Sequence, residues 1–175
     1  MKKIVVCGFF FLMIIIAACQ QKEEPKPNSH FPSGPIQTQD DIRLLQEAVR
    51  NNPRNVEAWI KFGNELMDSS RFSEAIEAYQ RALDIDPKNV DVRVDMGVCY
   101  RNTGKSDVAV KEFKKAIQIN PNHVMAHKNL GIVLAYDFRE NAGAVSEFEK
   151  VLQLSPNAPD AAKIREEIQK LKSGK

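Results

Sequence analysis

Residues 56–89 read VEAWIKFGNELMDSSRFSEAIEAYQRALDIDPKN, and residues 90–123 read VDVRVDMGVCYRNTGKSDVAVKEFKKAIQINPNH. The second stretch repeats the first with a shift of 34 residues. Glycine, alanine, an aromatic residue and proline return in the pairs Gly63 and Gly97, Ala75 and Ala109, Tyr79 and Phe113, Ala82 and Ala116, and Pro87 and Pro121. A third copy begins at Val124 and supplies Leu130, Gly131, Phe148 and Pro156. Self-similarity at a fixed period of this length is the sequence signature of a repeat architecture.

Each copy holds two stretches in which apolar residues recur three or four positions apart, the spacing of one helix face. In residues 56–89 the first stretch includes Phe62 and Leu66, the second includes Ala75 and Tyr79, and residues 68–70 separate them. The small residues let the two helices approach closely. A helix pair cannot cover its own apolar face, so neighbouring pairs must stack.

The pattern resembles the tetratricopeptide repeat (TPR), W-x2-L-G-x2-Y…A-x3-F…P. Arg93 and His127 stand where the first copy has Trp59. The resemblance implies an all-α, right-handed superhelical solenoid of antiparallel helix pairs. Pro121 and Pro156 are 35 positions apart, so the third copy carries one extra residue, which we place in its turn, residues 137–143.

Helices are also expected on both sides of the repeats. Residues 40–50 carry Ile42, Leu45 and Val49 on one face and resemble the second half of a repeat whose first half is missing. At the other end, Ile164 and Ile168 belong to an apolar stripe with a charged opposite face, as a solenoid cap requires.

The N-terminus has the three-part layout of a secretory signal. Two lysines precede an uncharged run of 13 residues, 4–16, which is shorter than the ~20 residues of a membrane-spanning helix. The ending IAAC at residues 16–19 resembles the lipobox of bacterial lipoproteins, in which the cysteine is acylated, for example with palmitate, after cleavage before it. An ordinary cleaved signal and an uncleaved anchor are the alternatives.

This resemblance implies a protein attached to the cell envelope through acylated Cys19, because two or more acyl chains hold a protein stably on a bilayer. The position after Cys19 holds Gln20 and not the aspartate that resembles an inner-membrane retention signal. We therefore expect the outer membrane, facing the periplasm, in a two-membrane bacterium, and otherwise the outer face of the cytoplasmic membrane. Residues 20–39 contain four prolines and no apolar period, which indicates a flexible tether.

The predicted organisation follows in chain order. The segments are a signal peptide (1–18), the lipidated cysteine and linker (19–39), an N-terminal half-repeat helix (40–55), three TPR-like repeats (56–89, 90–123 and 124–158) and a capping helix (159–175).

Nothing in the sequence indicates catalysis, a cofactor or nucleic-acid binding. Without Lys2 and Lys3 the basic and acidic residues balance at 23 each, whereas nucleic-acid binding favours a basic patch. His123 and His127 are four apart, but zinc needs three or four ligands, so we expect a turn residue and a core residue. Cys99 is expected to be buried as a small apolar group. Acidic residues are expected on solvated helix exteriors.

The TPR resemblance implies that the first helix of each repeat lines a concave groove that binds a protein or peptide. The positions carried over from the family are Glu57, Ile60, Asn64, Met67, Asp91, Val94, Val98, Arg101, Met125, Lys128, Ile132 and Tyr136, with Asp68, Asn102 and Ala135 beside them. Five of these, Ile60, Val94, Val98, Ile132 and Tyr136, would form an apolar strip. Contiguous exposed apolar residues indicate an interaction site.

One TPR subclass grips a terminal carboxylate with lysine and arginine. Here Ile60 and Met125 stand where that subclass has lysines, so we expect a helix or extended peptide with apolar anchors instead. The sequence thus predicts a lipid-anchored envelope adaptor, possible partners being secretion, pilus or cell-wall machinery. A structural module that assembles with copies of itself is the alternative. A further alternative is that the N-terminal or capping helix of the same chain covers part of the groove.

Overall fold

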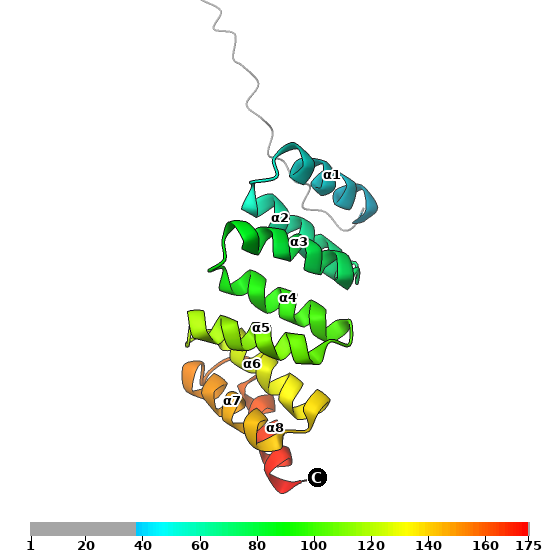
Figure 1. Cartoon of the computed structure of the whole chain (residues 1–175). Helices are drawn as coiled ribbons and strands as arrows, with labels where there is room; N and C mark the ends of the chain where they lie inside the picture. The colour runs from blue at the N-terminus through cyan, green and yellow to red at the C-terminus, as the bar shows by residue number, and fades with distance from the viewer. Residues whose placement is uncertain (1–37, 175) are drawn as a thin grey trace, which may run out of the picture. The chain divides into compact units, whose positions relative to one another are not determined.

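The computed structural model describes residues 38–174, so the predicted signal peptide, lipidated cysteine and most of the linker lie outside the described residues. The described chain is helical throughout and contains no strand (Figure 1). The elements are α1 (Thr38–Asn51), α2 (Val56–Asp68), α3 (Phe72–Ile85), α4 (Val90–Asn102), α5 (Ser106–Ile119), α6 (Val124–Val133), the π-helical turn η1 (Leu134–Phe138), α7 (Asn141–Leu154) and α8 (Ala161–Ser173). None of these helices combines the length and hydropathy that a membrane span requires.

Consecutive helices pack as pairs, and each pair packs on the next. The most extensive contacts are within α2–α3, α4–α5 and α6–α7, followed by α3–α4 and α5–α6. Helix α1 packs on α2 at one end of the series, and α8 packs on α7 at the other. The predicted all-α solenoid of three helix pairs with a flanking helix on each side is confirmed for residues 38–174.

The first helix of every pair begins with the same kind of cap. The side chains of Asn55, Asn89 and His123 accept a hydrogen bond from the backbone N–H three residues later, at 3.1 Å in each case. Such a cap satisfies one of the backbone donors that a helix N-terminus leaves unpaired. His123 is therefore a helix cap, and its ring Nδ1 takes the place of an asparagine oxygen.

Glycine lets the two helices of each pair touch. A Cβ added at Gly97 would lie 2.5 Å from a ring carbon of Phe113, and Gly63 and Gly131 face Tyr79 and Phe148 in the same way. The aromatic ring of the second helix thus lies directly against the backbone of the first. The repeated glycine and aromatic positions in the sequence encode this contact.

Three different residues occupy the position of the repeat tryptophan, and each makes an equivalent hydrogen bond to a proline carbonyl. Trp59 Nε1 donates to the Pro53 carbonyl over 3.0 Å and Arg93 donates to Pro87 over 2.8 Å. His127 Nε2 lies 2.9 Å from the Pro121 carbonyl. His127 is buried, as predicted, but it is bonded at both ring nitrogens and is more than a space-filling residue.

The residue of the second helix that faces this position also differs between the repeats. Arg93 forms an ion pair with Glu112 over 2.7 Å, and His127 Nδ1 lies 2.6 Å from Glu147. The equivalent residue opposite Trp59 is Ala78. Glu112 is only 6% exposed, so the expectation that acidic residues lie on solvated exteriors is wrong at this position. A buried carboxylate requires a charged or hydrogen-bonding partner, which Arg93 provides.

The expected turn at residues 137–143 is wrong. The chain stays helical to Phe138 through η1, and α7 already begins at Asn141. Arg139 adopts a left-handed conformation with φ 59°, as do Ser70 (φ 59°) and Gly104 (φ 76°) at the equivalent turns. Because the turns match, the extra residue of the third repeat must lie before Arg139. A π-helical turn accommodates one additional residue without ending the helix.

Candidate protein-binding surface

The surface predicted to bind a partner is formed by α2, α4 and α6. The term first-helix face is used below for the twelve positions that the TPR resemblance implies: Glu57, Ile60, Asn64, Met67, Asp91, Val94, Val98, Arg101, Met125, Lys128, Ile132 and Tyr136. Five of them are exposed: Glu57, Asn64, Asp91, Met125 and Tyr136. Six more are partly exposed: Ile60, Met67, Val98, Arg101, Lys128 and Ile132.

Val94 does not belong to this exposed surface. Its side chain is 4% exposed and lies in the same apolar core as Phe113 and Ala126. Ala135 is buried as well, at 7%. Helix α6 packs against α4, so a position that is open in an isolated repeat is covered by the next repeat. The apolar strip is therefore interrupted in the middle of the face.

Polar residues of α4 that belong to the first-helix face form contacts within the chain. Arg101 binds Asp137 of η1 through two hydrogen bonds of 2.8 and 2.9 Å, and Ser106 donates to the same carboxylate over 2.6 Å. This arrangement raises the pKa of Arg101 and lowers the pKa of Asp137. Asp91 lies 2.8 Å from His123 Nε2. These contacts tie α4 to the third repeat.

The segment around α8 occupies the end of the face. Lys128 pairs with Asp160, just before α8, and this contact lowers the pKa of that carboxyl. The Lys170 ammonium lies 5.9 Å from the ring centre of Tyr136, and a hydrogen bond with Glu167 raises the pKa of Tyr136. The capping region thus engages two of the predicted binding residues, as the sequence left open.

Helix α2 differs, because two of its side chains contact the hydroxyl of the buried Tyr79. The Tyr79 hydroxyl donates to Asn64 Oδ1 over 2.8 Å and also lies 3.8 Å from the Met67 sulfur. In the next two repeats the ring is phenylalanine, and the residues equivalent to Asn64 are Val98 and Ile132. The polarity of the face therefore follows the identity of the ring behind it.

Several carboxylates of α1, α2 and α4 act electrostatically on one another. The pKa of Asp95 on α4 is raised to about 6 by burial and then by the charges of Asp91 and Asp68, with His123 acting in the opposite direction. Burial and the charges of Asp41 and Asp68 raise the pKa of Glu65. Within residues 38–174, neither Asp95 nor Asp68 forms an ion pair with a lysine or arginine.

Sequence reasoning missed Asp95. It follows Asp91 by four positions on α4, the spacing at which helix neighbours face each other and like charges repel. That spacing was the available signal. The electrostatic coupling to Asp68 joins residues of two different repeats, which no local pattern reports.

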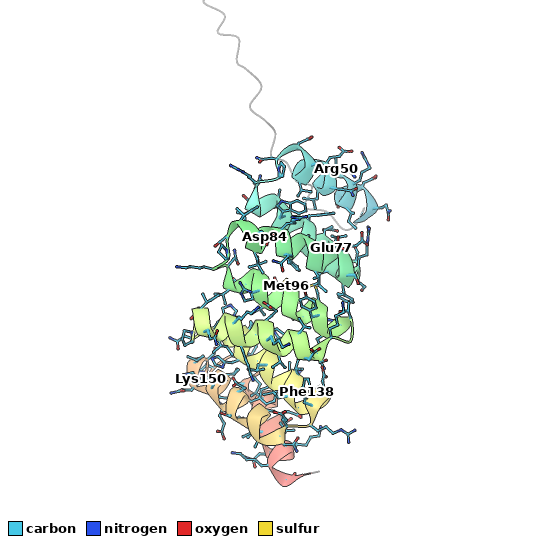
Figure 2. The ribbon with its side chains drawn as sticks, viewed as in Figure 1. Arg50, Glu77, Asp84, Met96, Phe138 and Lys150 are labelled. Atoms are coloured by element: carbon cyan, nitrogen blue, oxygen red, sulfur yellow. The ribbon has the colours of Figure 1, made fainter. Side chains whose placement is uncertain are left out.

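A cleft lies between α1 and α3. This cleft of ≈680 Å³ has Trp59 and Phe62 of α2 in its lining, with ring centres 6.3 Å apart. Its rim includes Arg50 of α1 with Glu77 and Asp84 of α3 (Figure 2). The sequence did not predict it, because its lining comes from α1, α2, α3 and α4, and no local pattern brings these residues together.

The described residues hold no arrangement suited to catalysis by a metal or a thiolate. No group of three His, Cys, Asp or Glu side chains within residues 38–174 is close enough to hold a metal ion. Cys99 is fully buried, as predicted, and burial followed by the charge of Asp95 raises its pKa to about 12. Its thiol is therefore protonated at neutral pH and unreactive.

The family and fold of the repeats agree with known proteins. Residues 66–130 match the tetratricopeptide repeat family model TPR_19. The crystal structure of MamA is similar over 76% of this chain and 75% of that chain, with 22% identity and a TM-score of 0.70. No curated protein sequence matches the chain significantly.

Two further similar structures contain peptides. The first TPR domain of Spaghetti (RPAP3), bound to the HSP90 peptide SRMEEVD, matches 77% of this chain and 93% of its own, with 22% identity and a TM-score of 0.59. The Yersinia enterocolitica type III secretion chaperone SycD, in complex with a peptide of the translocator YopD, matches 67% and 92%, with 16% identity and a TM-score of 0.63. These likenesses show the fold of the chain, and the family match concerns residues 66–130.

Proposed function

We propose that the protein is a lipid-anchored adaptor of the bacterial envelope that binds a partner protein or peptide on the first-helix face. The observation that carries this proposal is the apolar surface left on α6 and α4. Met125 is 48% exposed, Ile132 lies seven positions later on the same helix, and Val98 is partly exposed on α4. Residues seven apart share one helix face, and such a series can anchor an apolar peptide.

Two findings support a binding role over a catalytic one. The TPR domain of RPAP3 and the SycD chaperone both hold a peptide, although their likeness to this chain concerns the fold. The described residues also lack a metal-binding cluster and a reactive thiol. Apolar anchors on stacked helices match peptide recognition by shape and burial.

The envelope location is proposed from the sequence. The order of two lysines, an apolar run, small residues and Cys19 is the support for lipidation, and Gln20 favours the outer membrane in a two-membrane cell. The proline-rich residues 20–37 would then hold the repeats near the bilayer surface.

The anchor is tested with Cys19→Ala in the native cell. Loss of acyl labelling and accumulation of the uncut precursor are expected. Unchanged processing and acylation would show that the chain is not a lipoprotein. Cys7→Ala is the matched control, because Cys7 lies in the segment that is removed.

The binding surface is tested with a photo-crosslinking amino acid at Val98, with Gln118 as the control. Gln118 is exposed on the second helix α5 and lies outside the first-helix face. A discrete adduct from Val98 alone is expected. Adducts only between copies of the chain would favour the self-assembling module, and no adduct from Val98 would exclude this part of the face as the binding surface.

A further inference from the structure

One side of α1 is exposed where the other second helices are covered. Helix α1 corresponds to the second helix of a repeat, and within the described residues no helix precedes it. In the next repeat, Ala78 and Ala82 of α3 are 1% and 0% exposed, because α2 packs on them. The residues 34 positions earlier are Leu44 and Ala48, and both are exposed, Leu44 at 51%. We call the surface around Leu44 and Ala48 the open side of α1.

Four charged residues follow the open side along the helix: Asp40, Arg43, Glu47 and Arg50. Their spacings of three, four and three positions place them on one side of α1, next to Leu44, and all four are exposed. Arg43 and Glu47 lie 3.1 Å apart, whereas Asp40 and Arg50 have no ion-pair partner within residues 38–174. The signs alternate along the series, so the series read backwards is the complement of itself.

This charge series matches a second copy of α1 that runs in the opposite direction. In such a pair, Asp40 lies opposite Arg50 of the other copy, and Arg43 lies opposite its Glu47. Leu44 is next to the middle of the series, so the two Leu44 side chains would meet close to the twofold axis. A parallel pair in register would instead place like charges at the same level. Self-complementarity of this kind is what a twofold interface between identical subunits requires.

Two other segments of the protein fit the open side less well. Residues 20–37 contain four prolines, and proline in a helix interior breaks the helix, so this stretch is unsuited to form a first helix. Helix α8 of another copy would need to approach α1 as closely as α2 approaches α3. Gly63, Gly97 and Gly131 permit that approach in the three repeats, but the equivalent residue of α8 is Glu166.

We infer that α1 is a dimer interface, in which its open side binds the open side of α1 of a second copy in antiparallel orientation. The inference goes beyond the proposed function and does not depend on it, because Leu44 and Ala48 lie outside the first-helix face. A helix of 14 residues is about 21 Å long, so the interface is small and the dissociation constant is expected to be on the order of 10 μM. The dimer presents two first-helix faces, which strengthens binding to a partner with two copies of its segment.

The test exchanges charges between full-length copies purified in detergent, one labelled at the C-terminus with a fluorescence donor and the other with an acceptor. Energy transfer between them measures the dissociation constant. Arg43→Glu in both copies, or Glu47→Arg in both, places like charges opposite each other and should weaken the dimer at least about tenfold. A mixture of one Arg43→Glu copy and one Glu47→Arg copy has opposite charges at both contacts, so its affinity should return to the wild-type value.

The matched control is Lys114→Glu, which makes a comparable charge change at an exposed position of α5 and should leave the affinity unchanged. A wild type that stays monomeric throughout the micromolar range would overturn the inference. So would charge variants that dimerise like the wild type, or a mixture that remains as weak as either variant alone.

Photo-crosslinking in the native cell tests which molecule covers α1. A probe at Leu44 should give an adduct with the mass of two copies. The control position is Gln46, which is exposed on the same helix but lines the cleft between α1 and α3. An adduct of Leu44 with a different protein, or equal adducts from both positions, would show that the open side is not the dimer interface.

The two proposals fail in different ways. If Val98 forms its adduct with a partner and Leu44 forms none with a second copy, the adaptor function stands and the dimer is wrong. If Leu44 forms the dimer adduct and the charge exchange restores affinity while Val98 forms no adduct, the dimer stands and the proposed binding surface is wrong.

Discussion

Gly97 leaves no room for a methyl group, because a Cβ there would lie 2.5 Å from the Phe113 ring. Gly97→Ala should therefore lower the free energy of unfolding by about 1–3 kcal/mol through overpacking. Gly143→Ala is the matched control, since the nearest atom to its added Cβ is the end of Leu134 at 3.3 Å, and alanine is the better helix former. Chemical denaturation of both variants measures the difference, and equal effects would contradict the close contact.

Asp95 supplies a pH-dependent prediction. Its pKa in the folded chain is raised to about 6 from an ordinary value of 3.8, so the folded state holds the proton more tightly than the unfolded state. Stability should therefore fall as pH rises from about 4 to about 6 and stay level above that range. Asp95→Asn removes this contribution and should stabilise the protein by about 1 kcal/mol at pH 7.5, with little effect at pH 4.

Denaturation curves at the two pH values test this expectation. Glu166→Gln serves as the control because Glu166 is exposed and its carboxylate forms no ion pair within the described residues. A stabilisation of Asp95→Asn that is the same at both pH values would show that ionisation of Asp95 is not its cause.

The sequence predicted the residues whose role follows from their position in the repeat. It did not predict the residues whose environment is determined by a neighbouring repeat. Gly97 and Phe113 could be paired because their spacing recurs. Val94 was placed on the surface by the same spacing, yet α6 covers it. Asp95 was missed because its environment depends on Asp68 of another helix. Periodicity describes one repeat, whereas burial and electrostatics arise between repeats.

At the scale of elements, the turn between the two helices of each repeat imposes a left-handed residue. Gly104 meets this requirement without strain, whereas Ser70 and Arg139 adopt φ 59° with a side chain present. Arg139→Gly should raise the free energy of unfolding by about 0.5–1 kcal/mol, because glycine tolerates positive φ. The control is Gly104→Ala, which should destabilise by a similar amount. A destabilised Arg139→Gly would indicate that its side chain has a structural role.

The turn of the third repeat could not be placed correctly from sequence. The spacing of Pro121 and Pro156 gives the presence of one extra residue but not its location. Asp137 explains why the helix continues, since Arg101 and Ser106 of the preceding repeat hold its carboxylate. These partners are more than thirty positions away, so no local signal for the π-helical turn exists in the segment.

At the scale of the whole described chain, the core divides into two clusters. One is centred on Tyr79 and Leu66, and the other extends from Phe113 to Ile164 and Ile168 of α8. In a solenoid each repeat contacts only its neighbours, so perturbations at one end should remain local. The sequence predicted the fold at this scale because three copies in register leave few other ways to bury their apolar faces.

Ile164→Ala tests this locality. The substitution should cost about 2–5 kcal/mol in the C-terminal cluster and lower the hydrogen-exchange protection of α6, α7 and α8. Protection of α2 and α3 should change little. Gln169→Ala, at an exposed position of α8, is the control. Equal loss of protection in all helices would show that the chain unfolds as one cooperative unit.

The residues that donate to the Pro53, Pro87 and Pro121 carbonyls have a consequence for the order of the repeats. Trp59 faces a position held by Ala78, whereas Arg93 and His127 face Glu112 and Glu147. Exchanging α3 with α5 would leave a carboxylate opposite the indole ring and a guanidinium opposite alanine, each without its counterpart. The three copies are thus not interchangeable. A variant in which one copy is moved or duplicated would need both helices of that copy to be transferred as a unit.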